Sequence, residues 1–483
     1  MPLTFVIFGA SGDLTSRKLV PALYRLYRKK RLPPATRIVG SSRTAFSHEA
    51  FRQKLAESTA KFTGNDFDPT LWNEFAKNVF YQAGDLDQPN DMAALASMLD
   101  ELEQGASTTR IYYLATAPQF YEETVARLGA RGMADQHNGP RRIVIEKPFG
   151  TDLATARKLN VAVHEVFAES QVYRIDHYLG KETVQNMLVL RFANAVFEPL
   201  WNRNYVDHVK ITVAEDGKIG RRAGYYDSAG VMRDMFQNHL LQLLMISAME
   251  VPSQFEADLV RNEKVKVLQA VRRLDVDHVA ENTVRAQYAG YTQEPGVAVG
   301  SQTPTFAAVK LFIDNWRWQG VPFYLRSGKA MNCRTTQIVV QFRSPPHMVF
   351  DAGKHRVPEA NRLVIHIQPA EGIQLHLQTK VPDAGMRLRL TDLGFRFDAE
   401  FPGALPEAYE RLLLDAITGD ASLFARADEV ELAWGIVDPI LRTWQEQGVP
   451  DLYKYEAGNW GPIEAQKWIW RDGRDWLDSC PVL

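Results

Sequence analysis

The stretch that organises the N-terminal half of this chain reads Thr4-Phe5-Val6-Ile7-Phe8-Gly9-Ala10-Ser11-Gly12-Asp13-Leu14. It begins as an apolar run of strand length, and apolar residues at near-helical spacing follow it at Leu19, Leu23, Leu26 and Tyr27. Glycines between a strand and a helix let backbone N–H groups approach a pyrophosphate at the positive end of the helix. Glycines also occur in strand-to-helix turns that bind nothing. With a strand before it and a helix after it, the segment from Gly9 to Leu14 predicts a dinucleotide-binding turn.

Short apolar runs alternate with amphipathic stretches through the first part of the chain. The expected strands are residues 4–8, 37–40, 79–82, 110–115 and 142–146. This alternation is typical of a parallel sheet whose crossover connections are helices. Pro21 must lie in or near the first turn of the first helix, because proline has no N–H to donate. We predict a Rossmann-like NADP-binding domain with a parallel sheet over residues 1–176.

After about residue 176 the pattern changes to period-two alternation. The expected strands are residues 206–213, 305–313, 337–342 and 362–367, and the expected helices are residues 234–249, 256–268 and 406–417. Such alternation indicates strands of an antiparallel sheet with one covered face. We therefore predict a fold class of α/β plus α+β. The larger second domain, residues 177–483, is predicted to have a mostly antiparallel sheet flanked by helices.

Composition excludes several classes of partner. The 483 residues include 56 basic and 58 acidic side chains, so no global field attracts nucleic acid or an acidic membrane surface. The N-terminus does not have the pattern of a signal peptide, and no apolar stretch is long enough to span a bilayer. Cys333 and Cys480 are the only cysteines, which fits a reducing compartment, and we expect both thiols to be free. We expect a cytoplasmic enzyme that binds neither nucleic acid nor membrane.

The end of the second expected strand bears on the choice of cofactor. The segment Val39-Gly40-Ser41-Ser42-Arg43-Thr44 offers no carboxylate for a ribose 2′-hydroxyl but does offer hydroxyls and a guanidinium. A planar guanidinium can grip a 2′-phosphate bidentately, which favours NADP over NAD. The alternative is that Arg43 is a solvated loop residue.

A second motif, Glu146-Lys147-Pro148-Phe149-Gly150, ends the fifth expected strand, where the ligand crevice of a parallel sheet opens. Pro148 can hold a tight turn, in either peptide isomer, that aims Lys147 between cofactor and substrate. The alternative is an ordinary surface lysine followed by a turn proline.

Two further segments combine acids, cations and imidazoles: Arg174-Ile175-Asp176-His177-Tyr178-Leu179-Gly180-Lys181-Glu182, and Arg233-Asp234-Met235-Phe236-Gln237-Asn238-His239-Leu240-Leu241-Gln242. The first segment, which combines two cations with an imidazole, suits the binding of a phosphate. Oxidation of an alcohol needs a base that removes the hydroxyl proton, and a histidine can serve because the pKa of imidazole lies near neutral pH. A carboxylate behind the imidazole would fix its tautomer. No His, Cys or carboxylate spacing matches a zinc site, so we predict no metal.

These segments resemble the glucose-6-phosphate dehydrogenase family. The block at residues 174–182 is unbroken, and the blocks at 9–14, 146–150, 233–242, 320–329 and 406–412 stand in the family's order. The resemblance covers residues 4 to about 445. It implies oxidation of glucose 6-phosphate at C1 to 6-phosphogluconolactone with hydride transfer to NADP, the oxidative entry step of the pentose phosphate pathway.

The resemblance also implies a role for each matching residue. His239 would be the general base, oriented by Asp176. The sugar phosphate would be bound by His177 and Lys181, with Tyr178 beside them. The remaining substrate-binding residues would be Lys147, Glu215, Asp234, Lys329 and Arg334. The cofactor would be held by the turn from Gly9 to Leu14 and by Lys18, Arg43 and Lys147, with Lys18 near the nicotinamide.

One segment departs from the family pattern. Residues 219–224 read Ile-Gly-Arg-Arg-Ala-Gly, and we expect the change to alter a loop near the pocket rather than catalysis. Arg326 matches a residue that helps to hold a second, structural NADP in some relatives, but no other residue secures that site and we do not predict it. The resemblance further implies that residues 177–483 bind the substrate and build the dimer interface, in a homodimer or a homotetramer.

Two alternatives stay open beside this interpretation. Oxidoreductases of the glucose-fructose and inositol type also join a Rossmann domain to an antiparallel sheet and carry Glu-Lys-Pro, but they lack the block at residues 174–182. A non-catalytic NADP-binding redox sensor would be expected to lose His239 or Lys181, and the chain has both.

Overall fold

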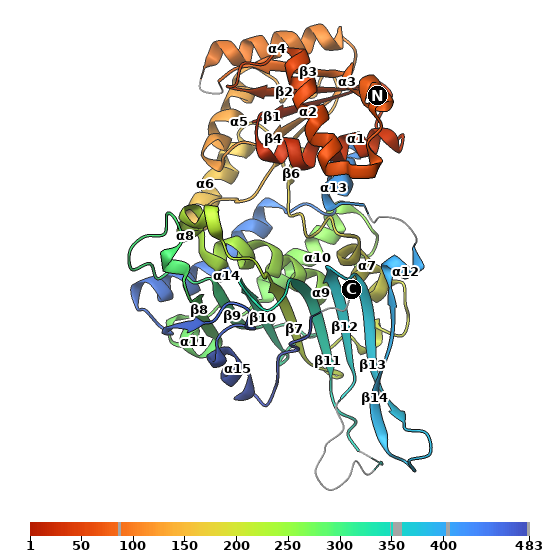
Figure 1. Ribbon diagram of the computed structural model, residues 1–483, viewed down its shortest axis with the longest axis vertical. Coiled ribbons are helices and arrows are strands. Elements are labelled where there is room, and N and C mark those ends of the chain that lie inside the picture. The colour runs from red at the N-terminus through yellow and green to blue at the C-terminus, as the bar shows by residue number, and fades with distance from the viewer. Residues whose placement is uncertain (86–87, 348, 351–359, 402–405, 481–483) are drawn as a thin grey trace. The chain divides into compact units, whose positions relative to one another are not determined.

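The computed structural model describes residues 1–85, 88–347, 349–350, 360–401 and 406–480. The chain forms two units, each with its own sheet (Figure 1). The first unit comprises Met1–Lys181, Pro252–Asn262 and Pro406–Glu431, and the second comprises Glu182–Val251, Glu263–Leu405 and Leu432–Leu483. Assignment of cofactor binding to residues 1–176 and of substrate binding to residues 177–483 stays a prediction.

The sheet of the first unit is parallel throughout, as predicted. Its strands are β1 (Leu3–Phe8), β2 (Thr36–Ser42), β3 (Val79–Ala83), β4 (Thr109–Leu114), β5 (Arg141–Ile145) and β6 (Val172–Arg174), in the order β3-β2-β1-β4-β5-β6. The chain thus moves outward from β1 to β3 and returns to β4 on the other side of β1. The carboxyl end of β1 therefore lies where the strand order reverses, which is where open parallel sheets bind their ligands.

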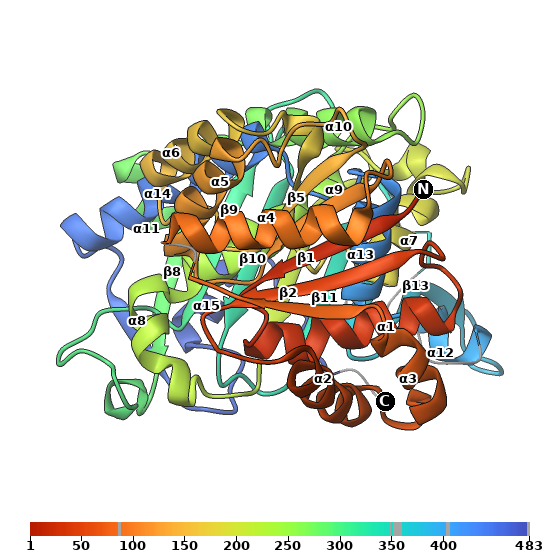
Figure 2. The same cartoon turned by 90° about the horizontal axis from the view of Figure 1, so that it is seen from above.

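Helices cover both faces of this sheet. They are α1 (Val20–Arg28), α2 (His48–Thr63), α3 (Pro69–Ala76), α4 (Pro89–Glu103), α5 (Tyr121–Ala130), α6 (Leu153–His164) and α13 (Ala408–Thr418). Figure 2 shows α1, α2 and α3 on one face and α4, α5 and α6 on the other. Because both faces are covered, every residue of β1 is buried, which explains why its sequence is continuously apolar rather than alternating.

The first helix begins with a wide turn. A π-helical segment, η1 (Thr15–Leu19), leads without a break into α1, and Pro21 is the second residue of α1, directly after this wide turn. This agrees with the position that the sequence required for Pro21.

The sheet of the second unit is mostly antiparallel, as predicted. Its strands are β7 (Val206–Ala214), β8 (Thr283–Tyr288), β9 (Phe306–Phe312), β10 (Pro322–Gly328), β11 (Thr335–Phe342), β12 (Arg362–Gln368), β13 (Gly372–Lys380), β14 (Leu388–Arg396) and β15 (Leu452–Tyr455), in the order β14-β13-β12-β11-β7-β10-β9-β8-β15. Two neighbouring pairs, β7 with β10 and β8 with β15, are parallel. The four strands expected from periodicity correspond to β7, β9, β11 and β12.

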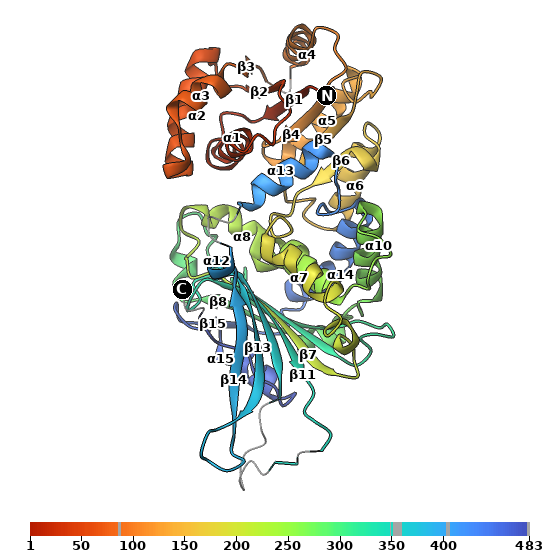
Figure 3. The same cartoon turned by 90° about the vertical axis from the view of Figure 1, so that its right-hand side faces the viewer.

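The helices of the second unit are α7 (Glu182–Phe192), α8 (Ala223–Val231), η7 (Met232–Leu240), α9 (Leu241–Ala248), α11 (Val276–Asn282), α12 (Phe397–Glu400) and α15 (Ile463–Trp470). Residues of α10 (Ala257–Ala270) and α14 (Ala427–Glu446) are divided between the two units. In Figure 3, α7 lies on one side of the sheet and α15 on the other, and α9 packs against α7. Within the described residues, no helix has both the length and the apolarity to cross a bilayer.

The two cysteines are joined, so the expectation of two free thiols was wrong. Cys333 lies in the loop between β10 and β11, and it forms a disulfide with Cys480 in the C-terminal segment. The partners are 147 residues apart in sequence, with Cα atoms 6.0 Å apart. Their pairing depends on the path by which the C-terminal segment returns along the sheet, which no local pattern encodes.

Candidate active site

The predicted dinucleotide turn follows β1 directly. Gly9 has a φ of +77°, and a Cβ atom there would lie 2.6 Å from the Ala115 carbonyl oxygen, so only glycine fits this close approach. The N–H groups of Gly9 and Ala10 donate to the Ser41 carbonyl oxygen (2.8 and 3.1 Å). The turn is therefore held against the end of β2, beside the segment that leads to Arg43.

Three cations of the first unit accompany this turn. Arg43 is exposed just after β2. Lys18, in η1, pairs with Glu407 (3.1 Å). Lys54, which sequence reasoning missed, extends from α2 and donates to the Ser11 carbonyl oxygen (2.8 Å). A lysine at helical spacing is usually a solvated side chain, so only the packing of α2 against η1 indicates its place.

The second predicted motif lies at the end of β5. The Lys147–Pro148 peptide bond is cis. The Glu146 carboxylate accepts hydrogen bonds from the hydroxyls of Tyr113 and Tyr409. Burial raises the pKa of Glu146 above its ordinary value. Lys147 thus stands between a fixed, buried acid and a proline turn.

The block at residues 174–182 forms a compact turn after β6. The buried Asp176 accepts a hydrogen bond at Oδ1 from the Tyr178 N–H (2.9 Å). The Lys181 Nζ atom lies 4.3 Å from the centroid of the Tyr178 ring, and the His177 ring lies beside the same tyrosine. His177 and Lys181 are each partly exposed, so one short turn presents an imidazole and an ammonium together.

His239 lies in the second unit, in a helix of unusual geometry. The chain kinks at Gly230, whose φ is +64°, and then forms the π-helical segment η7 before continuing as α9. The predicted helix over residues 234–249 is thus present, although its first turns are wide. π-helical turns are frequent at functional sites. The His239 side chain is buried, and its backbone N–H donates to the Asn238 side-chain oxygen (2.6 Å).

The second unit contains a cavity of about 230 Å³, called the sugar pocket below. It is lined by Glu215, Asp216, Gly217, Lys218, Ile219, Arg222, Tyr225, Tyr226, Asp234, Lys329 and Arg334. Four of the predicted substrate-binding residues, Glu215, Asp234, Lys329 and Arg334, therefore share one cavity.

The parallel pairing of β7 and β10 explains why these residues meet. Ala214 and Gly328 are register partners, so the residues that follow them, Glu215 and Lys329, leave the sheet at the same edge. The Glu215 N–H donates to the Gly328 carbonyl oxygen (3.0 Å), which fixes the two ends together.

Charges in the sugar pocket form a triad. The Lys329 Nζ atom pairs with the Glu215 carboxylate and lies 2.9 Å from the Asp234 carboxylate. Burial by itself would lower the pKa of Lys329, but the two carboxylates outweigh it and raise the pKa above its ordinary value. The lysine is therefore a fixed cation between two acceptors that can bind sugar hydroxyls.

Several pocket residues were not predicted from sequence. Tyr226 is buried, and the Lys329 Nζ atom lies 5.5 Å from the centroid of its ring. Lys218 and Arg222 add two cations. The segment that departs from the family pattern contributes Ile219 and Arg222 to the lining, so it does border the pocket. In the local sequence, only the adjacent tyrosines Tyr225 and Tyr226 could have indicated that this segment lines the pocket.

Family models and curated relatives match this chain over nearly its whole length. Residues 6–186 match the family model for the NAD binding domain of glucose-6-phosphate dehydrogenase, and residues 188–477 match the model for its C-terminal domain. A glucose-6-phosphate 1-dehydrogenase of Aggregatibacter actinomycetemcomitans is 46% identical over 98% of this chain and 96% of its own. One from Rhizobium meliloti (strain 1021) is 43% identical over 99% of this chain and 98% of its own.

Solved structures of glucose-6-phosphate dehydrogenases also match this chain over nearly its whole length. A glucose-6-phosphate dehydrogenase in complex with its substrate glucose-6-phosphate matches with a TM-score of 0.91 at 35% identity, over 99% of this chain and 98% of that chain. A glucose-6-phosphate 1-dehydrogenase from Mycobacterium avium matches with a TM-score of 0.86 at 36% identity, over 100% and 99%. An oxidoreductase from Sinorhizobium meliloti, 13% identical with a TM-score of 0.50, shares the fold alone.

Proposed function

The chain belongs to the glucose-6-phosphate dehydrogenase family, and on this premise we propose that it oxidises glucose 6-phosphate at C1 to 6-phosphogluconolactone, with hydride transfer to NADP. The observation in the chain's own residues that carries the proposal is the sugar pocket. Glu215, Asp234 and Lys329 there form a charged triad at the paired ends of two parallel strands. Neutral polyols are also bound by such groups, so the phosphate must be recognised elsewhere.

The turn after β6 supplies the groups for phosphate recognition. His177 and Lys181 project from one turn and are partly exposed, while Tyr178 packs beneath them. An ammonium and a protonated imidazole donate charge-assisted hydrogen bonds, which are about twice as strong as neutral ones. We assign the 6-phosphate to His177 and Lys181, with Lys147 reaching both substrate and cofactor.

The reaction requires one proton to leave the C1 hydroxyl. We assign its removal to the His239 imidazole, with the buried Asp176 carboxylate orienting the ring and stabilising the imidazolium that forms. Glu215 and Asp234 would accept hydrogen bonds from sugar hydroxyls, and Lys329 and Arg334 would hold the ring in place. A fixed orientation of this kind lets the C1–H bond face the acceptor without further rearrangement.

The residues of the first unit fit a bound dinucleotide. Gly9 lets the turn pack against the Ala115 carbonyl oxygen, where a Cβ atom would clash, and a glycine turn that opens a helix typically binds a pyrophosphate through its backbone N–H groups. A bound NADP supplies the hydride acceptor. Arg43 would hold its 2′-phosphate, Lys18 would lie near its nicotinamide end, and Lys54 adds a cation at the turn.

Initial-rate measurements test the substrate assignment. We expect NADP reduction with glucose 6-phosphate to exceed that with glucose by at least about 100-fold in kcat/KM, because free glucose leaves the phosphate-binding cations without their partner. Equal rates with the two sugars would instead support the polyol-type alternative. Binding of NADP without turnover of either sugar would support the redox-sensor alternative.

The cofactor arm of the same experiment uses Arg43→Ala. We expect the KM for NADP to rise about 10-fold or more and the KM for NAD to change little, since only NADP carries the 2′-phosphate that a bidentate guanidinium grips. Arg31→Ala removes another exposed arginine of the same unit and serves as the matched control. An equal effect of Arg43→Ala on both cofactors would assign Arg43 to the adenosine that they share.

One edge of the sheet in the second unit exposes apolar side chains. β14 is an edge strand, and Leu393 and Phe395 on it are 65% and 37% exposed. Exposed apolar side chains on an edge strand are a liability that pairing of subunits removes. We propose a homodimer or homotetramer in the cytoplasm, and light scattering should give a mass of two or four chains of 54.7 kDa.

A further inference from the structure

The disulfide lies next to the sugar pocket. Residues 329–334, called the Lys329 loop below, join β10 to β11, begin with Lys329 and end with Arg334. Both of these residues line the sugar pocket. Cys333 immediately precedes Arg334, so its bond to Cys480 links a wall of the substrate site covalently to the C-terminal segment.

The C-terminal segment, residues 474–480, is docked on the sheet by contacts that precede Cys480. Arg474 pairs with Asp207, Trp476 is buried, and Arg326 pairs with Asp478. In addition, the side chains of Lys210 and Gln337 donate to carbonyl oxygens of this segment. These contacts hold the segment as far as Asp478. The disulfide, together with a hydrogen bond from the Asn332 side chain to the Cys480 sulfur (3.3 Å), continues the link to the Lys329 loop.

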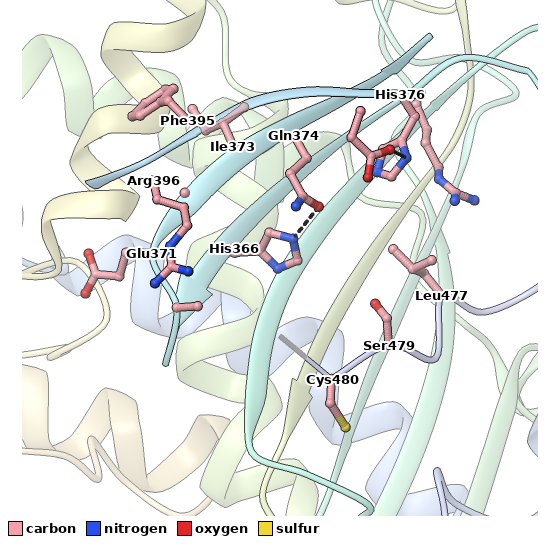
Figure 4. A pocket seen from close by; sticks show the side chains of 14 residues that line it. His366, Glu371, Ile373, Gln374, His376, Phe395, Arg396, Leu477, Ser479 and Cys480 are labelled. Carbon is pink, nitrogen blue, oxygen red and sulfur yellow. Dashed lines mark hydrogen bonds and ion pairs between the residues drawn. The ribbon is translucent and has the colours of Figure 1, made fainter. Parts of the chain in front are cut away.

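The disulfide is open to attack by a small thiol. Cys480 is exposed and Cys333 is partly exposed. Cys480 also borders a cavity of about 290 Å³. Figure 4 shows Leu477, Ser479 and Cys480 on one side of this cavity, with His366 and Gln374 on strands β12 and β13 opposite them. Exposed disulfides in reducing compartments are more often redox-responsive than structural.

We propose that Cys333–Cys480 is a reversible thiol–disulfide site that sets the affinity of the sugar pocket. In the reducing direction, a thiolate of a dithiol reductant attacks the Cys480 sulfur, and the Cys333 thiolate leaves. The second thiol of the reductant then breaks the mixed disulfide. Two electrons and two protons pass to the protein as two thiols, and the reductant becomes a disulfide. The inference rests on the proposed function, because its readout is sugar phosphate binding.

The other contacts of the Lys329 loop explain why reduction of the disulfide should change substrate binding more than the chemical step. Lys329 stays bound to Glu215 and Asp234, and the N–H groups of Ala330 and Met331 donate to the Gly217 and Glu215 carbonyl oxygens (2.9 and 2.8 Å). None of these contacts involves Cys333. Breaking the disulfide therefore loosens residues 332–334 just before β11, which position Arg334, whereas the pairing of Thr335 with Ala214 and the charged triad remain. Binding should weaken, with less effect on the chemical step.

The test compares oxidised and dithiothreitol-reduced protein. Because the chain has two cysteines, thiol titration of the unfolded protein should find no thiols before reduction and two afterwards. We expect reduction to raise the KM for glucose 6-phosphate about fivefold, as for loss of one hydrogen bond by Arg334, with kcat changed less than about twofold. The KM for NADP should stay constant. Reoxidation should restore the original KM.

Cys480→Ser and Cys333→Ser serve as permanent mimics of the reduced form. Both should have the KM of the reduced wild type and should not respond to dithiothreitol. Cys480→Ser changes an exposed residue near the chain end, so it tests the proposal even where Cys333→Ser fails to fold. Two thiols that mild oxidation does not convert into a disulfide, or equal KM values in both states, would overturn the proposal. An oxidised protein that turns over no sugar phosphate would instead overturn the proposed function.

Discussion

Replacing His239 with asparagine is expected to lower kcat for glucose 6-phosphate at least about 100-fold, the usual loss for a missing general base. Asparagine keeps a polar side chain of similar size in a buried position, but it cannot accept the hydroxyl proton at neutral pH. The KM for glucose 6-phosphate should change little, because the groups assigned to the sugar and its phosphate remain. Initial rates over a range of substrate concentrations separate the two parameters.

A matched control is available in the same unit. His278 is exposed in α11, where it bonds to Asp275, and His278→Asn should leave kcat within about twofold, as expected for a surface substitution. Thermal unfolding of both variants shows whether the fold is retained. A folded His239→Asn enzyme with a kcat near that of the wild type would assign the proton to another group.

Replacing Lys329 with methionine is expected to lower kcat/KM for glucose 6-phosphate about 100-fold or more. The substitution leaves the Glu215 and Asp234 carboxylates facing each other without the ammonium that separates them. An uncompensated charge in a partly buried site is strongly unfavourable, so one acid should bind a proton and no longer accept a hydrogen bond from the sugar. Raising the pH should restore part of the lost activity.

Lys218→Met provides the comparison for Lys329. Lys218 also lines the sugar pocket, but it is exposed, and its loss should lower kcat/KM less than about fivefold, because exposed charges contribute little. If both lysines proved equally important, the pocket would act through its overall charge. The triad would then have no special role.

The dinucleotide turn could be predicted because it is local. A strand, two glycines and a helix lie within one short stretch, and the structure has Gly9 at a positive φ against the Ala115 carbonyl oxygen. The binding of a dinucleotide there stays a prediction. The block at residues 174–182 is local in the same way, since Tyr178 contacts both Asp176 and Lys181 within a single turn.

The sugar pocket could not be predicted from local patterns. Glu215 and Lys329 meet because β7 and β10 pair in parallel, although more than 100 residues, some of them in the first unit, separate the two strands in sequence. Only the resemblance to a family brought Glu215 and Lys329 into one site. Tyr226 and Lys54 were missed because nothing in their neighbouring sequence distinguishes them from ordinary core and surface residues. The disulfide was missed for the same reason, since long-range pairing decides it.

The parallel pairing of β7 and β10 also governs when the site can form as the chain folds. Adjacent parallel strands require a crossover, and this one contains the helices α8, η7, α9, α10 and α11 and the strands β8 and β9. Contacts between residues so far apart in sequence form slowly, because the entropy of closing the intervening loop must be overcome first. A nascent chain released before β10 has emerged would carry His239 and Glu215 but not Lys329. Substrate binding should therefore be among the last properties that a newly synthesised molecule acquires.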